Sequence, residues 1–211
     1  MNRAVARRPA SRRLGRPPAS DRTVTRERIL STARTTFSEL GYASTTNRHL
    51  AAAADVTTGA IYHYFESKLD LYRAVYDTSQ AVVYDRFEAA VDGAETFVTG
   101  LEVVLDLAHE MNNTDPSLAR FLGAIRIDAR RNPELRAIFR TGYVRRESFF
   151  ESLVDLGITT GEIDVDDRDR VVVLIRVMMI GLVDAVSDDQ GVHRTAIEGI
   201  KRLVEGKLVR S

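Results

Sequence analysis

Apolar residues recur at intervals of three and four along most of the chain, and this spacing constrains the fold most strongly. The first such run ends before Gly41 and consists of Ile29, Ala33, Phe37 and Leu40. These intervals place side chains on one face of a helix, whereas a strand needs alternation every two residues. Further helices are predicted over residues 46–54, 58–65, 68–92, 95–112, 117–130, 133–156, 167–187 and 193–207. The sequence therefore predicts an all-α protein of about nine helices.

Composition narrows the class of protein. The chain has 211 residues, of which 44% are hydrophobic and 28% charged, which is typical of one or two domains with a buried core. It has no cysteine, so disulfides and thiolate metal sites are excluded. The longest apolar stretch, 171–186, contains Arg176 and Asp184, and the amino terminus lacks the apolar segment of a secretion signal. We expect a soluble cytoplasmic protein that needs no membrane.

The charge is balanced overall but unevenly distributed. The chain has 30 basic and 30 acidic residues, yet residues 1–73 contain 13 Arg or Lys against 6 Asp or Glu. Six arginines and no acid lie within the first 20 residues. A cationic end on a neutral protein favours a polyanionic partner at that end. Considered alone, however, this arm is equally typical of a solvated disordered tail.

The segment 46–65 predicts a helix, a turn of about three residues and a second short helix. The inward residues are Leu50, Ala53, Val56, Ile61 and Phe65, and the outward residues of the second helix are Thr58, Gly59, Tyr62 and His63. This geometry places a second helix in the major groove of DNA. Small residues at the helix start allow close approach to base edges, and hydroxyl and ring N–H groups reach bases or phosphates.

Lys68 begins the next predicted helix, where the helix dipole disfavours a cation by about 0.3–1 kcal/mol. An approaching anion removes that penalty, so Lys68 predicts a phosphate site at this helix start. The alternative is an ordinary surface lysine.

These residues carry a resemblance to a known family. The pattern includes Arg28-Ile29-Leu30, Ala33, Phe37, Gly41-Tyr42, Thr45-Thr46, Leu50-Ala51, Ala54, Val56, Gly59, Ile61-Tyr62, Tyr64-Phe65, Ser67-Lys68 and Leu71. In identity and spacing, without a gap, it resembles the DNA-binding domain of the TetR family of transcriptional regulators. Two positions depart from the family pattern. Asp55 replaces the usual turn glycine but tolerates the left-handed conformation, and His49 replaces an acid and weakens the capping box.

The resemblance implies roles for individual residues. Phosphate contacts are expected from Thr46, with Asn47 or Arg48 beside it, and from Lys68. Base contacts are expected from Thr57, Thr58, Gly59 and Ala60, and contacts to the backbone or a base edge from Tyr62 and His63. Attached to such a DNA-binding domain, Arg12, Arg13 and Arg16 would enter an adjacent minor groove. The alternative is that these arginines contribute only a non-specific electrostatic attraction to DNA.

We predict three parts: a disordered Arg-rich arm (1–22), a helix-turn-helix domain (23–70) and a helical body (71–211). Residues 171–183 are apolar around nearly the whole helix, which predicts either a central core helix or packing against a second copy. The resemblance implies a homodimer through helices near 167–187 and 193–207, and a small effector in the body. Candidate pocket residues are His109, Phe121, Arg126, Tyr143, Phe150 and Met178, although each is also typical of an ordinary core or surface position.

Other functions find little support. The chain lacks a dinucleotide-binding glycine motif, a phosphate-binding loop, an H-E-x-x-H motif and a nucleophile elbow, so no enzyme and no cofactor are expected. The four histidines lack the spacing of metal ligands. The sequence predicts a DNA-binding regulator, foremost a repressor that binds a palindromic operator as a dimer and is released by an effector. The alternatives are an activator, an effector-independent regulator and a helical protein-interaction module.

Overall fold

The computed structural model describes residues 19–184 and 188–208, and this part of the chain is all-α, as the sequence predicts. The helices are α1 (Ala19–Ser44), α2 (Asn47–Ala53), α3 (Thr58–Tyr64), α4 (Lys68–Val91), α5 (Phe97–Thr114), α6 (Pro116–Arg131), α7 (Pro133–Thr159), α8 (Arg168–Asp184) and α9 (Gln190–Val204), with a short 3₁₀ helix η1 (Val165–Asp167) before α8. Arg12, Arg13 and Arg16 of the predicted arm lie outside the described residues.

Side-chain caps explain where several helices begin. Thr46, Thr57 and Ser67 precede α2, α3 and α4, and each accepts a hydrogen bond from a backbone N–H of the first turn. Gly41 interrupts α1 with φ of 73°, a left-handed conformation that glycine adopts without strain. The predicted end of the first helix at this glycine therefore corresponds to a real break in the helical backbone.

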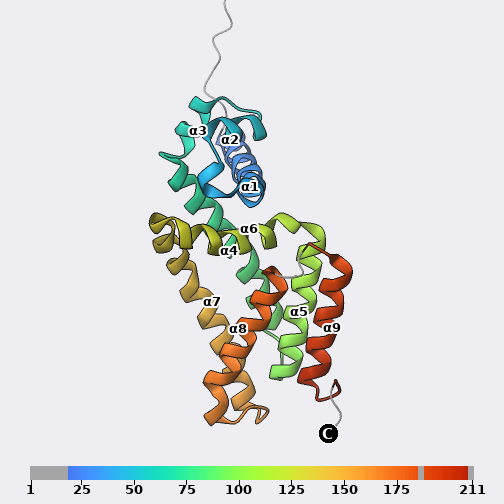
Figure 1. Cartoon of the computed structure of the whole chain (residues 1–211). Coiled ribbons are helices and arrows are strands. Elements are labelled where there is room, and N and C mark those ends of the chain that lie inside the picture. The colour runs from blue at the N-terminus through green and yellow to red at the C-terminus, as the bar shows by residue number, and fades with distance from the viewer. Residues whose placement is uncertain (1–18, 185–187, 209–211) are drawn as a thin grey trace, which may run out of the picture.

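The helices form a small head above a longer body (Figure 1). The head contains α1, α2 and α3, while α4 runs from the head down into the body, and α6 crosses between the two. The first hydrophobic cluster includes Phe37 and Leu50 of the head, but also Phe121 and Ile125 of α6 and Ile138 of α7. The head is therefore packed against the body through a shared core. The division at residue 70 falls inside α4 and remains a prediction.

A second hydrophobic cluster fills the body between α4, α5, α7, α8 and α9. Within α8 only Val172, Ile175 and Leu182 are buried, whereas Val173, Leu174 and Val177 are about half exposed (49%, 51% and 60%). The predicted alternative of a central core helix is therefore wrong for the described chain. No helix in the described ranges is long and apolar enough to cross a membrane.

Candidate DNA interface and effector cavity

A tight turn connects α2 to α3. Asp55 adopts φ of 50°, and the N–H of Val56 donates to the carbonyl oxygen of Ala51 at 3.0 Å. Leu50, Ile61 and Phe65 are buried and hold the two helices on the core of the head. An aspartate thus supports the turn in place of glycine, as the sequence predicts.

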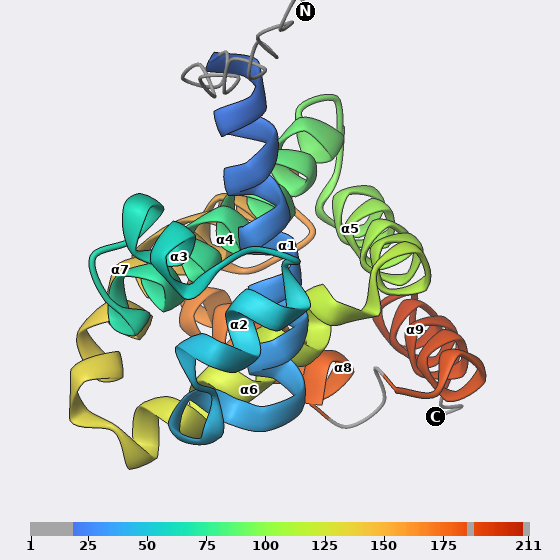
Figure 2. The same ribbon diagram turned by 90° about the horizontal axis from the view of Figure 1, so that it is seen from above.

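The first turn of α3 lies on the outside of the head (Figure 2). Thr57, Thr58 and Gly59 are exposed, and Ala60 is half-buried. A Cβ atom at Gly59 would meet only the Thr57 hydroxyl oxygen, at 3.8 Å. The helix therefore begins with a small, hydroxyl-bearing edge from which backbone and side chains are accessible to a large partner.

Two ring side chains extend this edge by one turn. Tyr62 is 53% exposed, and its hydroxyl accepts a hydrogen bond of 2.5 Å from Nδ2 of Asn47 in α2. His63 is exposed, and its Nε2 lies 3.2 Å from Nη2 of Arg22 in α1. Three helices thus contribute polar groups to one surface, and Arg22 adds a positive charge that the predicted site did not include.

Thr46 and Arg48 are exposed at the start of α2, beside Asn47. The capping box at this end is complete, because Nδ1 of His49 accepts from the Thr46 N–H at 3.4 Å while Thr46 Oγ1 accepts from the His49 N–H at 3.2 Å. Histidine therefore occupies the place of the expected acid in the box, and the predicted weakening relative to an acid remains a prediction.

Lys68 has partners inside the protein. Its Nζ donates to the carbonyl oxygens of Tyr42 and Thr45, each at 2.8 Å, and lies 4.2 Å from the centre of the Tyr42 ring. Burial lowers the pKa of Lys68, and the carboxylates of Glu134 and Asp128 oppose that shift. Two carbonyl oxygens thus offset the positive charge at this helix start, where the sequence predicts a phosphate. One of the three ammonium hydrogens remains for a phosphate.

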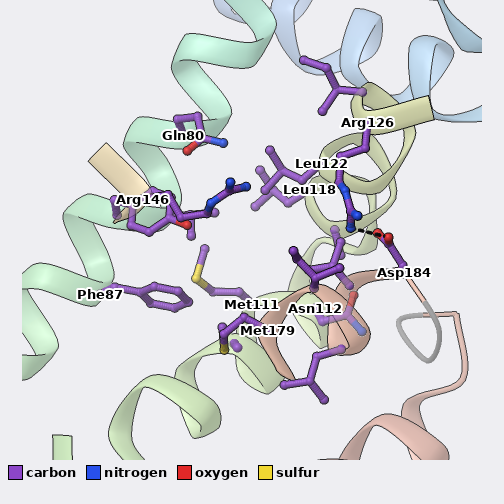
Figure 3. A pocket seen from close by; sticks show the side chains of 18 of the residues that line it. Gln80, Phe87, Met111, Asn112, Leu118, Leu122, Arg126, Arg146, Met179 and Asp184 are labelled. Carbon is purple, nitrogen blue, oxygen red and sulfur yellow. Dashed lines mark hydrogen bonds and ion pairs between the residues drawn. The ribbon is translucent and has the colours of Figure 1, made fainter. Parts of the chain in front are cut away.

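A cavity of about 120 Å³ lies in the body between α4, α5, α6, α7 and α8 (Figure 3). Of the six predicted pocket residues, only Arg126 and Phe150 line it. Phe121 packs against Tyr72 in the core shared with the head, and Met178 packs against the second cluster instead, while its neighbour Met179 lines the cavity. These two residues therefore lie outside this cavity.

The remaining two predicted pocket residues lie behind the wall of the cavity. His109 contacts His193, which does line the cavity, through Nδ1 atoms 3.0 Å apart. Tyr143 is 36% exposed and stacks under the guanidinium of Arg146, 4.6 Å from the ring centre. Each touches a lining residue without reaching the cavity itself.

Comparison with known proteins agrees with this architecture. Residues 29–75, which include α2, α3 and the start of α4, match the family model described as bacterial regulatory proteins, tetR family. The head is a DNA-binding domain of the TetR type. The matched segment and the relatives indicate a DNA-binding transcriptional regulator.

Relatives of similar length cover both the head and the body of the chain. It is 24% identical over 189 residues to the HTH-type transcriptional regulator UidR of Escherichia coli strain K12, covering 89% of this chain and 94% of UidR. A TetR transcriptional regulator from Chloroflexus aurantiacus has 27% identity and a TM-score of 0.74, with 88% and 96% of the two chains covered. The regulator FadR of Bacillus subtilis, solved with stearoyl-CoA, has 22% identity and a TM-score of 0.72, with 85% and 98% covered.

Sequence reasoning missed three functional candidates. Arg22 precedes the matched motif, and only the tertiary fold brings its guanidinium group beside His63. Gln80 and Arg146 line the cavity from α4 and α7. A signal existed for both, because each is a polar residue four positions from an aromatic residue of the same helix face, Tyr76 and Phe150.

Proposed function

We propose that this TetR-family chain is a repressor that reads a palindromic operator with two copies of α3. The observation that carries the proposal is the exposed edge from Thr57 to Gly59, with Tyr62 and His63 one turn later. Thr57, Thr58, Gly59 and Ala60 face the bases. Phosphates meet Thr46, Asn47, Arg48 and the free hydrogen of Lys68. Tyr62 and His63 contact the backbone or a base edge.

We infer a homodimer through α8 and α9. Val173, Leu174 and Val177 of α8 and Val192 and Leu203 of α9 expose about half of their side chains. A Cβ atom at Gly181 in α8 or Gly199 in α9 would meet no atom within 4 Å, so a partner helix could approach closely there. Two heads on one rigid body also suit half-sites that are about 34 Å apart.

The described cavity is the proposed effector site, and α6 is the element that connects it to the head. Arg126 of α6 lines the cavity and donates to Asp184 of α8 at 2.5 Å. Two residues later, Asp128 accepts from the Tyr42 N–H at 2.9 Å and from the Tyr72 hydroxyl at 3.1 Å. A ligand that moves α6 therefore changes the contacts that hold the head. It reduces affinity for DNA when it favours the wrong spacing of the two heads. FadR of B. subtilis, solved with stearoyl-CoA, supports an effector role by similarity.

Selection of bound sites from random duplex DNA tests this function. We expect an inverted repeat whose half-sites are related by two-fold symmetry, bound by a dimer in the cytoplasm where DNA is present. A reporter placed behind the selected site should lose expression when the protein is made. Recovery of a single asymmetric half-site would contradict the dimer, and increased reporter expression would favour the activator alternative.

A further inference from the structure

The described cavity has an unusual combination of apolar walls and excess positive charge. Tyr84, Phe87, Met111 and Leu118 supply apolar surface on several sides. The charged side chains that line it are Arg126, Arg146, Arg176 and Asp184. Asp184 neutralises Arg126, since Oδ2 of Asp184 lies 2.5 Å from Nη1 of Arg126. The net charge of the cavity lining therefore depends on the other two arginines.

Arg146 and Arg176 share one carboxylate. Glu147 accepts from Nε of Arg146 at 3.4 Å and from Nη2 of Arg176, and both Arg146 and Glu147 are largely buried, with side chains 14% and 12% exposed. Two guanidinium groups therefore face one carboxylate among the described residues. A buried charge without a full counter-charge costs free energy, and an incoming anion removes that cost.

The geometry shows where the anion would bind. The Arg146 guanidinium stacks on the rings of Tyr143 and Phe139, at 4.6 Å and 5.8 Å from their centres, and its terminal nitrogens point into the cavity (Figure 3). These nitrogens make no hydrogen bond within the described chain, since Nε alone reaches Glu147. A planar guanidinium held in this way matches the two oxygens of a carboxylate.

Gln80 adds a second polar group on the same side of the cavity (Figure 3). It is 9% exposed, and its Oε1 is buried without a hydrogen-bond partner. Such an atom costs free energy unless a donor reaches it. A hydroxyl group on a bound molecule would supply that donor.

We propose that the cavity binds a small organic monocarboxylate with an apolar body, its carboxylate on Arg146 and, where it has one, a hydroxyl on Gln80. Apolar cavities of about 150 Å³ hold a benzene ring, so a cavity of about 120 Å³ suits one ring or a short branched chain. This inference rests on the proposed effector site and specifies its ligand class.

Calorimetric titration of the full-length protein tests the ligand class with benzoate, phenylacetate and hexanoate against benzamide, phenylacetamide and hexanamide. Each acid should bind at least about tenfold more tightly than its amide, because only the acid pairs with the guanidinium. This comparison needs no variant, so it stands even if a substitution disturbs folding. Amides that bind as tightly as the acids, or no acid binding up to about 10 mM, would overturn the proposal.

Matched arginine variants of the same helix locate the site. Arg145 lies next to Arg146 but faces outward to Asp85 and Glu88 at 2.6 Å. Arg146→Met should weaken acid binding at least about tenfold and leave amide binding unchanged, whereas Arg145→Met, with the same loss of charge, should leave both unchanged. Equal losses in the two variants would overturn the placement at Arg146. Gln80→Leu should abolish any gain of 3-hydroxybenzoate over benzoate.

Release of DNA is measured separately on the selected operator. Binding of an acid without release would remove the effector role of the cavity but leave its ligand class intact. Release by a neutral molecule that competes for the same cavity would retain the effector role and overturn the ligand class. The two proposals therefore fail on different results.

Discussion

At the residue scale, the small and polar residues of the head have two kinds of role. Thr58, Gly59 and Tyr62 are exposed and available to DNA. Lys68, in contrast, connects the end of α1 to the start of α4 through two carbonyl oxygens. A single lysine can serve both folding and binding, and the two contributions are separable by experiment.

Lys68→Met should lower the free energy of unfolding by about 1–3 kcal/mol, because two carbonyl oxygens of the head lose their donor. If the third ammonium hydrogen also meets a phosphate, the slope of log affinity against log salt should flatten by about 0.9 per protomer. Urea denaturation and DNA titration at several salt concentrations measure the two effects. Lower stability with an unchanged slope would restrict Lys68 to the internal role.

The sequence predicts residues of the head better than residues of the cavity, for a physical reason. Thr57 and Asp55 act through backbone geometry within a few positions of the chain, so their type and spacing define their role. Gln80 and Arg146 face one cavity from different helices, and only tertiary packing brings them together. Phe121 illustrates the opposite case, since its apolar character fits a cavity wall and a core equally well.

At the element scale, α8 and α9 expose apolar residues that no other described part of the chain covers. Periodicity alone predicts that α8 is buried on several sides but not which surface covers it. The structure leaves Val173, Leu174 and Val177 uncovered within one chain. A second copy of the chain is the cover that we propose.

Val177→Glu and Gly199→Leu should each convert a dimer into a monomer at micromolar concentration, measured by sedimentation. The first places a charge on the proposed interface, and the second fills the open space above Gly199. Val144→Glu on α7 is the matched control, because Val144 is 66% exposed and should tolerate the charge without a change of mass. A dimer that persists in both test variants would contradict an interface through α8 and α9.

The contact between α5 and α9 should make stability depend on pH. His109 and His193 stack with ring centres 5.2 Å apart. Burial lowers the pKa of both imidazoles. Arg194 lowers the pKa of His109 further, against Asp106 and Glu198, and His109 lowers that of His193. Because the unfolded chain then binds protons more readily, stability should fall as pH decreases below the ordinary histidine pKa near 6.5.

Thermal unfolding between about pH 7.5 and pH 5.5 checks this expectation. The decrease should be smaller in His193→Asn and His109→Gln than in the wild-type protein, whereas His63→Gln on the exposed face of α3 should retain the full decrease. An identical decrease in all four proteins would show that the histidine pair is not its source.

At the scale of the whole molecule, α4 and α6 connect the head to the body. α4 carries Tyr72 in the core of the head and Gln80 at the cavity, while α6 carries Asp128 beneath the head and Arg126 at the cavity. Both helices therefore connect the core of the head to the lining of the cavity. The helices themselves are predicted well by apolar spacing and caps, but this double contact follows from how α6 crosses α4, which periodicity does not encode.

The most direct measurement of the central account is the affinity of Gly59→Glu for the selected operator, compared with that of Gly93→Glu. Both glycines have room for a Cβ atom, since the one at Gly59 meets only Thr57 at 3.8 Å and the one at Gly93 meets nothing within 4 Å. Both variants should therefore fold with nearly wild-type stability. Gly59→Glu should bind DNA at least about 100-fold more weakly, because a carboxylate would face the bases and phosphates, and Gly93→Glu should bind normally. Normal DNA affinity of a folded Gly59→Glu protein would contradict the reading of DNA by α3.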